Sequence, residues 1–299
     1  MATSAITPGA LGGGNDQVQY AGFWKGAWRR FRRNFLAMYG LFFVIFIVTI
    51  AVFAPVVTGY PYDKIDLDHA LETPNADHWL GTDQLGRDML SRIVFAARPM
   101  LLVGILTQVA AMLIGVPLGI VAGYAGGVFD WVVTRLIDFF SALPWYLVVL
   151  YLIMLLRPSL ENLIIALTIT SWVFPCRIAR GLTLSVREQD YVEAARALGI
   201  PTSRVLLYHV LPQALPLLLW GFAVGIPTSV FAEAGLSFIG MGIRPPDPSW
   251  GQMLGESGQW WIYRPHMFVY PGLMIALSVL AFQGLADGLR SAIDVNVNI

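Results

Sequence analysis

Six stretches without a charged side chain run through the sequence, each bounded by ionisable residues. A helix needs about 20 apolar residues to cross the roughly 30 Å hydrocarbon core of a bilayer. Only helices and closed barrels satisfy their backbone polar groups in lipid, and these stretches have the length of helices. We therefore expect an all-α integral membrane protein with about six transmembrane helices. The expected spans are residues 36–57, 101–124, 139–156, 162–174, 211–231 and 268–286.

Composition supports a lipid environment. Charged residues make up 13% of the 299 residues, about half the share of a soluble domain, and a surface so poor in charge would not stay dissolved. The formal net charge of zero predicts no general attraction to nucleic acid. Cys176 is the only cysteine, which excludes an intrachain disulfide. The bilayer is thus the first partner that the sequence predicts.

The distribution of basic residues sets the expected orientation. With six spans both ends lie on one side, and 12 of the 19 Lys and Arg residues fall on that side. Because cytoplasmic segments carry the excess of Lys and Arg, we expect both ends inside. The run from Arg29 to Arg33 before the first span contributes most. We expect a flexible N-terminus over 1–33, the first span and outer loop over 34–98, a core over 99–294 that includes the inner loop 177–212, and a tail over 295–299.

The inner loop contains a helix signature. Asp190 followed by Glu193 is typical of a capping box, and Gly199 supplies a left-handed residue that ends a helix. Pro201 suits the start of a second helix, which Leu211 and Pro212 would break before the next span. Between cap and stop lies one apolar face at helical spacing. That face is formed by Tyr191, Ala194, Ala195 and Leu198.

Such a face outside the membrane needs a partner. A second protein would satisfy it, and so would the span ends of the same chain or the lipid headgroups; the residues alone leave both open. Elsewhere, Gly115, Gly119 and Gly123 lay a strip of small residues along one span. Strips of this kind allow close helix contact, although glycine is also simply common in membrane helices.

The sequence carries no recognisable catalytic motif. A phosphate-binding P-loop needs a lysine after a glycine-rich turn, and neither Lys25 nor Lys64 has that context. The four histidines are scattered without the spacing of a metal site. Charged residues are missing from the predicted span cores, which argues against an ion-coupled carrier. We therefore expect no catalytic residue, no metal and no cofactor in this chain, and energy supplied by a partner.

The outer side offers candidates for contact with a substrate. Glu233 and Glu256 are expected near the outer mouth, where they would meet a cationic group or pair with Arg244 or Arg264. The aromatic residues of 250–270 are typical of an interface belt, with ligand stacking as the alternative. The residues expected along a substrate path are Gln108, Ser229 and Glu233.

The inner loop also resembles a known element. Residues 191–199 (Tyr-Val-Glu-Ala-Ala-Arg-Ala-Leu-Gly) and 209–212 (His-Val-Leu-Pro) are similar to the "EAA" loop of ABC-importer permeases. In that family the loop helix docks on the ATPase subunit and transmits its motion. The resemblance implies a type I importer fold with a cytoplasmic coupling helix. By that resemblance the docking residues are Asp190, Tyr191, Glu193, Ala194, Ala195, Leu198, Gly199, Leu211 and Pro212.

Further segments narrow the resemblance. Residues 78–92, 233–240, 245–251 and 287–290 are similar to signatures of the second ("C"-type) permease of dipeptide, oligopeptide and nickel importers. Departures occur at Pro99-Met100, Gln213 and Asp294, none of them in the EAA core.

The resemblance implies a multi-pass protein of the prokaryotic inner membrane that works by alternating access. Its implied partners are a homologous second permease, two cytoplasmic ATPases that hold ATP and Mg, and an extracytoplasmic binding protein. The implied substrate is a di- or oligopeptide, with nickel, glutathione, haem and oligosaccharides as alternatives. A channel or secondary carrier that acts alone would instead require charges within its spans, and a membrane scaffold would not explain the capped inner helix.

Overall fold

The computed structural model describes residues 26–293, which are helical apart from their loops and one isolated bridge, Thr82 to Asp88. The predicted segments 1–25 and 294–299 lie outside the described residues, while 26–33 form a helix rather than a flexible arm. The elements are α2 (Phe35–Val52), α3 (Ala54–Val57), η1 (Leu67–His69), α4 (Met89–Ala125), α5 (Gly127–Ala142), α6 (Trp145–Leu156), α7 (Leu160–Ser171), α8 (Val173–Arg187), α9 (Asp190–Ala197), α10 (Thr202–Val205), η2 (Leu206–Val210), α11 (Leu211–Phe238), α12 (Trp250–Ser257) and α13 (His266–Ile293).

Within residues 26–293, five helices are long and apolar enough to cross a membrane, and the pair α5 and α6 supplies a sixth span if it is counted as one. The five are α2, α4, the continuous stretch Leu160–Arg187, α11 and α13. The expectation of about six spans is thus confirmed. The third span is not one straight helix over 139–156, because α5 and α6 meet at 88°. Pro144 explains the bend, since it holds Leu143 in an extended conformation.

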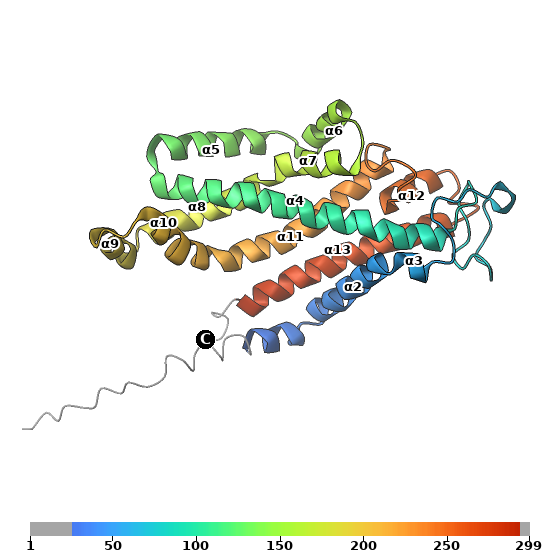
Figure 1. Cartoon of the computed structure of the whole chain (residues 1–299), viewed down its shortest axis with the longest axis horizontal. Helices are drawn as coiled ribbons and strands as arrows, with labels where there is room; N and C mark the ends of the chain where they lie inside the picture. The colour runs from blue at the N-terminus through green and yellow to red at the C-terminus, as the bar shows by residue number, and fades with distance from the viewer. Residues whose placement is uncertain (1–25, 294–299) are drawn as a thin grey trace, which may run out of the picture.

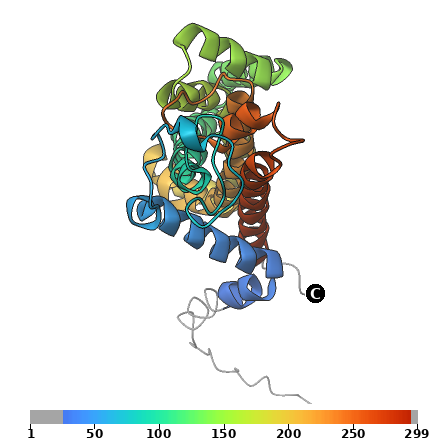
Figure 2. The same ribbon diagram turned by 90° about the vertical axis from the view of Figure 1, so that its right-hand side faces the viewer.

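The long helices run side by side along the long axis of the molecule (Figure 1). α4 lies among them and contacts α2, α8 and α11, while α13 packs on α2 and α11. α12 and the loop before α4 lie at one end, and α9 with α10 at the other. Figure 2 views the bundle from the end that carries α12 and that loop. The functional segments therefore sit at opposite ends of one helical bundle.

The glycine strip of α4 makes a close helix contact. A Cβ atom at Gly115, Gly119 or Gly123 would lie 2.4, 2.3 or 2.7 Å from a backbone carbonyl oxygen of the helix at Trp172, Cys176 or Arg180. These distances are too short for any side chain larger than hydrogen. The prediction of tight packing is confirmed, and the partner is the α7–α8 helix.

The fourth span extends well beyond the predicted 162–174. α7 and α8 form a continuous stretch from Leu160 to Arg187, so the predicted inner loop from residue 177 begins only after Arg187. The charge-free window underestimated the helix because α8 is amphipathic and carries arginines on one side. Arg177 and Arg180 therefore belong to a spanning helix and not to a loop.

Pro212 does not break the chain into two helices. α10, η2 and α11 follow one another without a gap, and η2 is one π-helical segment. The N–H of Leu211 reaches back to the carbonyl of Leu206, five residues earlier. A wider turn accommodates proline, which has no N–H to donate and whose ring clashes with the carbonyl four residues before it. The coupling segment thus enters α11 as one helix with a π-turn.

Ionisable residues do occur within the membrane helices. Glu233 lies in α11 and is only 3% exposed, and α5 carries Asp130, Arg135 and Asp138. The charge-free windows that defined the spans are shorter than the helices themselves. The absence of charge therefore holds for the window centres but not for whole helices, which weakens that argument against an ion-coupled carrier.

Candidate functional site

The inner-loop helix α9 is well defined at both ends. The carbonyl of Gln189 accepts hydrogen bonds from the N–H groups of Val192 and Glu193, at 2.9 and 3.2 Å. The helix therefore begins one residue earlier than the predicted capping box, and Asp190 and Glu193 lie in its first turn, where the helix dipole favours acidic groups. At the other end the N–H of Ile200 bonds to the carbonyl of Ala195 at 3.1 Å.

Gly199 ends α9 as predicted. Its φ of +74° lies in the left-handed region, where glycine has no Cβ penalty. Together with the bond from Ile200 to Ala195 it forms a Schellman motif. This turn fixes the direction in which the chain enters α10.

α9 presents two apolar faces rather than one. Val192 (0% exposed) and Ala195 (6%) are buried and belong to a cluster with Val205 of α10. Tyr191, Ala194 and Leu198 are exposed, and Leu198 is 81% exposed. Ala195, predicted as a docking residue, therefore packs within the chain. Of the alternatives left open by the sequence, packing within the same chain holds for the buried face, and a partner protein at the exposed face stays a prediction.

A hydrogen bond joins the exposed face of α9, which carries Tyr191, Ala194 and Leu198, to the next span. The side-chain N–H of Gln213, at the start of α11, donates to the Tyr191 hydroxyl at 2.6 Å. Leu211 is half-buried and Pro212 is exposed at the transition from η2 to α11. α9 is therefore connected to α11 in two ways, by the backbone through η2 and by this side-chain bond. The second connection uses Gln213, one of the positions that depart from the resembled motif.

The neighbouring helix ends are tied together by arginines that the sequence reading did not single out. Arg180 of α8 forms a two-point ion pair with Asp130 of α5, one arm being Nη2 to Oδ2 at 2.7 Å. Arg187 donates to the carbonyl of Gly123, at the end of α4, at 3.0 Å. The inner ends of α4, α5 and α8 thus form one unit beside α9. Fifty residues separate the ion-paired partners, so no local pattern signals the pair.

A cleft of about 390 Å³ opens between α4, the α5–α6 bend, the α7–α8 helix and α11. Gln108 lines it and donates to the Ser229 hydroxyl at 2.8 Å, so two of the three predicted path residues meet. Glu233 does not line the cleft. Its carboxylate accepts hydrogen bonds from Ser237 and Ser249 at 2.7 and 2.6 Å. The volume lies within the usual range for a site that holds a small organic ligand.

The opposite end of the bundle contains a buried ionic network. Asp83 and Glu256 both bind Arg87 and Arg92, with Arg87 Nε to Asp83 Oδ2 at 2.6 Å and Arg92 Nη1 to Glu256 Oε2 at 2.9 Å. Arg92 is 1% exposed. Glu256 therefore pairs with neither Arg244 nor Arg264. The 78–92 signature is the core of this network, and its role is to fasten the outer loop to α12.

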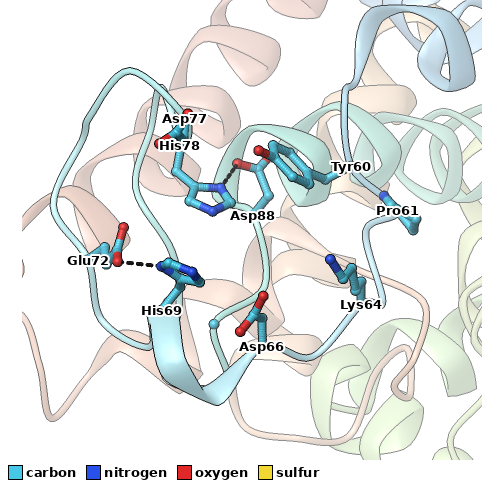
Figure 3. Close-up of a pocket in the computed structure, with 10 residues that line it drawn as sticks. Tyr60, Pro61, Lys64, Asp66, His69, Glu72, Asp77, His78 and Asp88 are labelled. Atoms are coloured by element: carbon cyan, nitrogen blue, oxygen red, sulfur yellow. Dashed lines mark hydrogen bonds and ion pairs between the residues drawn. The ribbon is translucent and has the colours of Figure 1, made fainter.

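Beside the network, a pocket of about 230 Å³ is lined by Tyr60, Lys64 and several acidic residues and histidines (Figure 3). His69 contacts Glu72 at 2.7 Å and His78 contacts Asp88 at 3.0 Å. The bond to Glu72 raises the pKa of His69, and His69 in turn lowers the pKa of Glu72. Across residues 26–293 no group of three His, Cys, Asp or Glu side chains is placed to hold a metal ion.

Two aromatic residues of the outer segment differ in their setting. Trp250 is buried and donates its indole N–H to the carbonyl of Ile93 at 3.0 Å. Tyr263 is 75% exposed, as a residue of an interface belt would be. Trp250 is therefore a packing residue of the bundle and not a ligand-stacking surface.

The sequence matches families of known proteins. Residues 115–298 match the family profile described as "Binding-protein-dependent transport system inner membrane component". Residues 22–74 match the "N-terminal TM domain of oligopeptide transport permease C". The Bacillus subtilis (strain 168) oligopeptide transport system permease protein OppC is 39% identical over 91% of this chain and 89% of its own length.

Other relatives carry different names. The glutathione transport system permease protein GsiD of Escherichia coli O6:K15:H31 is 38% identical over 94% of this chain and 93% of its own length. Among solved structures, an inward-facing form of the MetNI methionine ABC transporter matches with a TM-score of 0.57 at 19% identity. That match covers 68% of this chain and 97% of the other, and it supports the fold alone.

Proposed function

The chain belongs to the family of binding-protein-dependent transport system inner membrane components and is a permease subunit of an ABC importer, and from that premise we propose that it imports peptides. Permeases named for oligopeptides and dipeptides are among its relatives, and they match it over nearly the whole chain. The protein lies in the inner membrane, and ATP hydrolysis belongs to a separate subunit.

The family implies partner permease and ATPase subunits. We propose that one homologous permease completes the path, that two cytoplasmic ATPases with bound ATP and Mg drive it, and that an extracytoplasmic binding protein delivers substrate. The predicted inside position of α9 fits this assembly. Closure of the ATPases would move α9, and the movement would open the path alternately outward and inward.

The exposed face of α9 is the observation that carries the docking proposal. Ala194 and Leu198 leave apolar surface exposed on a helix that is capped at both ends and anchored by Val192. Ala194 allows close backbone approach, and Leu198 offers a knob for a hydrophobic groove. A helix fixed on one face and bare on the other is suited to transmit force from a partner.

Two serine substitutions on α9 test the docking role. Leu198→Ser should lower ATP-driven uptake about tenfold or more and leave the unfolding temperature nearly unchanged, because the Leu198 side chain is 81% exposed. Val192→Ser should lower both, since it buries a hydroxyl in an apolar cluster. Ile65→Ser removes another exposed apolar side chain, 59% exposed in the outer loop, and should change neither. Wild-type uptake in the Leu198 variant would refute docking at this face.

Gly199→Pro provides a second test of coupling. Proline fixes φ near −65°, whereas Gly199 has a φ of +74°, so the turn between α9 and α10 cannot form as it stands. The variant should still insert in the membrane while its ATP hydrolysis no longer drives uptake. Unchanged uptake per ATP hydrolysed would count against the role of this turn.

The substrate class is tested in proteoliposomes that contain the complete transporter and its binding protein. Uptake of trialanine is compared with that of glutathione, because relatives are named for both peptides and glutathione. The proposal expects ATP-dependent uptake of trialanine. Uptake of glutathione alone would reassign the substrate, and uptake of neither would refute peptide import.

A further inference from the structure

The cleft between the spanning helices is lined by apolar and neutral polar side chains with one exception. Among the described residues that line it, Arg177 is the single charged side chain. It lies on α8, within the stretch Leu160–Arg187 that crosses the membrane. The sequence reading had counted it as a loop residue. Its position inside a spanning helix makes it a candidate for contact with a substrate.

The guanidinium of Arg177 is only partly engaged. Its Nη2 donates to the Ser141 hydroxyl at 2.7 Å, a neutral partner on α5. Within residues 26–293 no carboxylate lies at ion-pair distance from it, whereas its neighbour Arg180 pairs with Asp130. An arginine side chain has five N–H donors. Most of them therefore remain available toward the cleft.

An unpaired cation among apolar walls calls for an anionic partner. Charges at membrane depth are expensive unless they are paired or face water, and this one is exposed in the single chain and lines a cleft of about 390 Å³. A guanidinium matches a carboxylate with two parallel hydrogen bonds, which gives both strength and orientation. Phe140 and Phe174 add apolar surface to the same wall.

From this geometry we propose that Arg177 binds the terminal carboxylate of the transported molecule and so orients it in the path, an inference that rests on the proposed peptide import. The other end of the cleft is polar but uncharged, with Gln108 bonded to Ser229. This end offers neutral hydrogen-bonding groups to the rest of the molecule.

The spacing of the two ends fits an extended peptide. Gly115 packs against the backbone nitrogen and Gly119 against the carbonyl of Cys176, the residue before Arg177. These glycines follow Gln108 by 7 and 11 positions on α4, which corresponds to about 10–17 Å along a helix axis at 1.5 Å per residue. An extended chain covers about 3.3–3.6 Å per residue, so about three to five residues span the distance. A pentapeptide is therefore a suitable probe.

The test compares pentaalanine with its C-terminal amide, which lacks the carboxylate. Uptake of both is measured in proteoliposomes with the complete transporter and its binding protein, for wild type, Arg177→Gln and Arg177→Lys. The binding protein is the same in every preparation, so its own preference cancels when variants are compared. Arg135→Gln is the matched control, because Arg135 is an exposed arginine that does not line the cleft.

Arg177→Gln should lower uptake of pentaalanine about tenfold, the effect of losing a charged hydrogen bond, and leave uptake of the amide at the wild-type level. Arg177→Lys keeps the charge but loses the two-point hydrogen bond, so its uptake of the free acid should lie between that of wild type and that of Arg177→Gln. Arg135→Gln should behave like wild type. Equal losses for acid and amide would overturn the inference in favour of a partner-subunit acid at Arg177, and wild-type uptake in Arg177→Gln would overturn it outright. If the wild type imports neither probe, peptide import itself fails.

Discussion

The two ends of the bundle differ in how their side chains are paired or exposed. At the end that carries α12, Arg87 and Arg92 are buried and bind two carboxylates of the same chain. At the end that carries α9, Leu198 is 81% exposed and Tyr208 is 71% exposed. At the first end the buried charges are matched within the chain, and exposed apolar residues such as Ile65 and Tyr263 lie in its loops. At the second end the exposed apolar residues lie on the capped helix α9 and on η2.

This difference assigns different tasks to the two ends. A buried network with matched charges holds a loop in place, because moving one charged group away would leave its partner buried without a counter-charge. A capped helix held by one face remains able to move with whatever binds its other face. Substitutions at the α12 end should therefore act mainly on the free energy of unfolding. Substitutions on the exposed face of α9 should act mainly on uptake per ATP hydrolysed.

The largest effect on stability is expected at Arg92. Arg92→Met leaves Asp83 and Glu256 without one of their two cations, and breaking a buried pair costs about 3–5 kcal/mol. Thermal unfolding of the purified protein in detergent measures the loss. Arg135→Met removes a 64% exposed partner of Asp138 and should cost less than about 1 kcal/mol. Equal effects of the two changes would show that the network is not needed to hold the loop.

A smaller loss is expected where α4 meets α8. Gly119→Ala places a Cβ 2.3 Å from the carbonyl oxygen of Cys176, and overpacking of this kind costs about 1–3 kcal/mol. The control is Gly181→Ala on α8, where a Cβ would meet nothing within 4 Å. That change should stabilise by about 0.5–1 kcal/mol, since alanine favours helix over glycine. The free energy of unfolding of both variants, measured under one set of conditions, tests this difference. A loss in Gly119→Ala no larger than in Gly181→Ala would contradict it.

At the α9 end, Tyr191→Phe removes the hydroxyl that accepts from Gln213. A single hydrogen bond contributes about 0.5–1.5 kcal/mol, so uptake per ATP hydrolysed should fall a few-fold without loss of ATPase binding. Simultaneous measurement of uptake and hydrolysis tests this. Unchanged coupling would leave the backbone through η2 as the single described route from α9 to α11.

The smallest effect concerns the titration of His69. The hydrogen bond to Glu72 raises the pKa of His69 above its ordinary 6.5, so the stabilisation from the charged histidine is complete below pH 6.5 and is lost as the pH rises through the raised value. Glu72, whose pKa is lowered from 4.5, contributes above pH 4.5 and loses its share as the pH falls through the lowered value. Both members of the pair are therefore mostly charged between pH 4.5 and pH 6.5.

Nuclear magnetic resonance of the imidazole protons measures the pKa of His69 directly. Glu72→Gln should return the pKa toward 6.5, whereas Asp68→Asn, which removes a weaker electrostatic contribution, should lower it less. An unchanged pKa in Glu72→Gln would show that the contact does not form in solution.

The sequence predicted those features that depend on local pattern. Charge-free windows located the spans, Gly199 located the end of α9, and the α4 glycine strip located a close contact. The bend at Pro144 was not predicted, because a hydropathy profile does not show the direction of a helix axis. The extent of α8 was missed because its arginines face a cleft and a neighbouring helix, not lipid.

Features that depend on distant partners were not predictable in the same way. Ala194 and Ala195 are both apolar, and only the packing of α10 against α9 makes Ala195 the buried one. Asp130 and Arg180 lie 50 residues apart, and Glu256 meets Arg92 across 164 residues. Arg177 had been assigned to a loop, and its role in the cleft depends on the α5–α6 bend. Tertiary contacts, not residue spacing, decided each of these cases.

Site-specific photo-crosslinking at position 198 tests the central claim most directly. A benzophenone amino acid replaces Leu198 in the complete transporter in native membranes, and the same group replaces Ile65 in the outer loop as a control. The account predicts that irradiation joins position 198 to an ATPase subunit, and that position 65 gives no such product. Crosslinking of position 198 to lipid or to another segment of this chain, with no ATPase product, would contradict it.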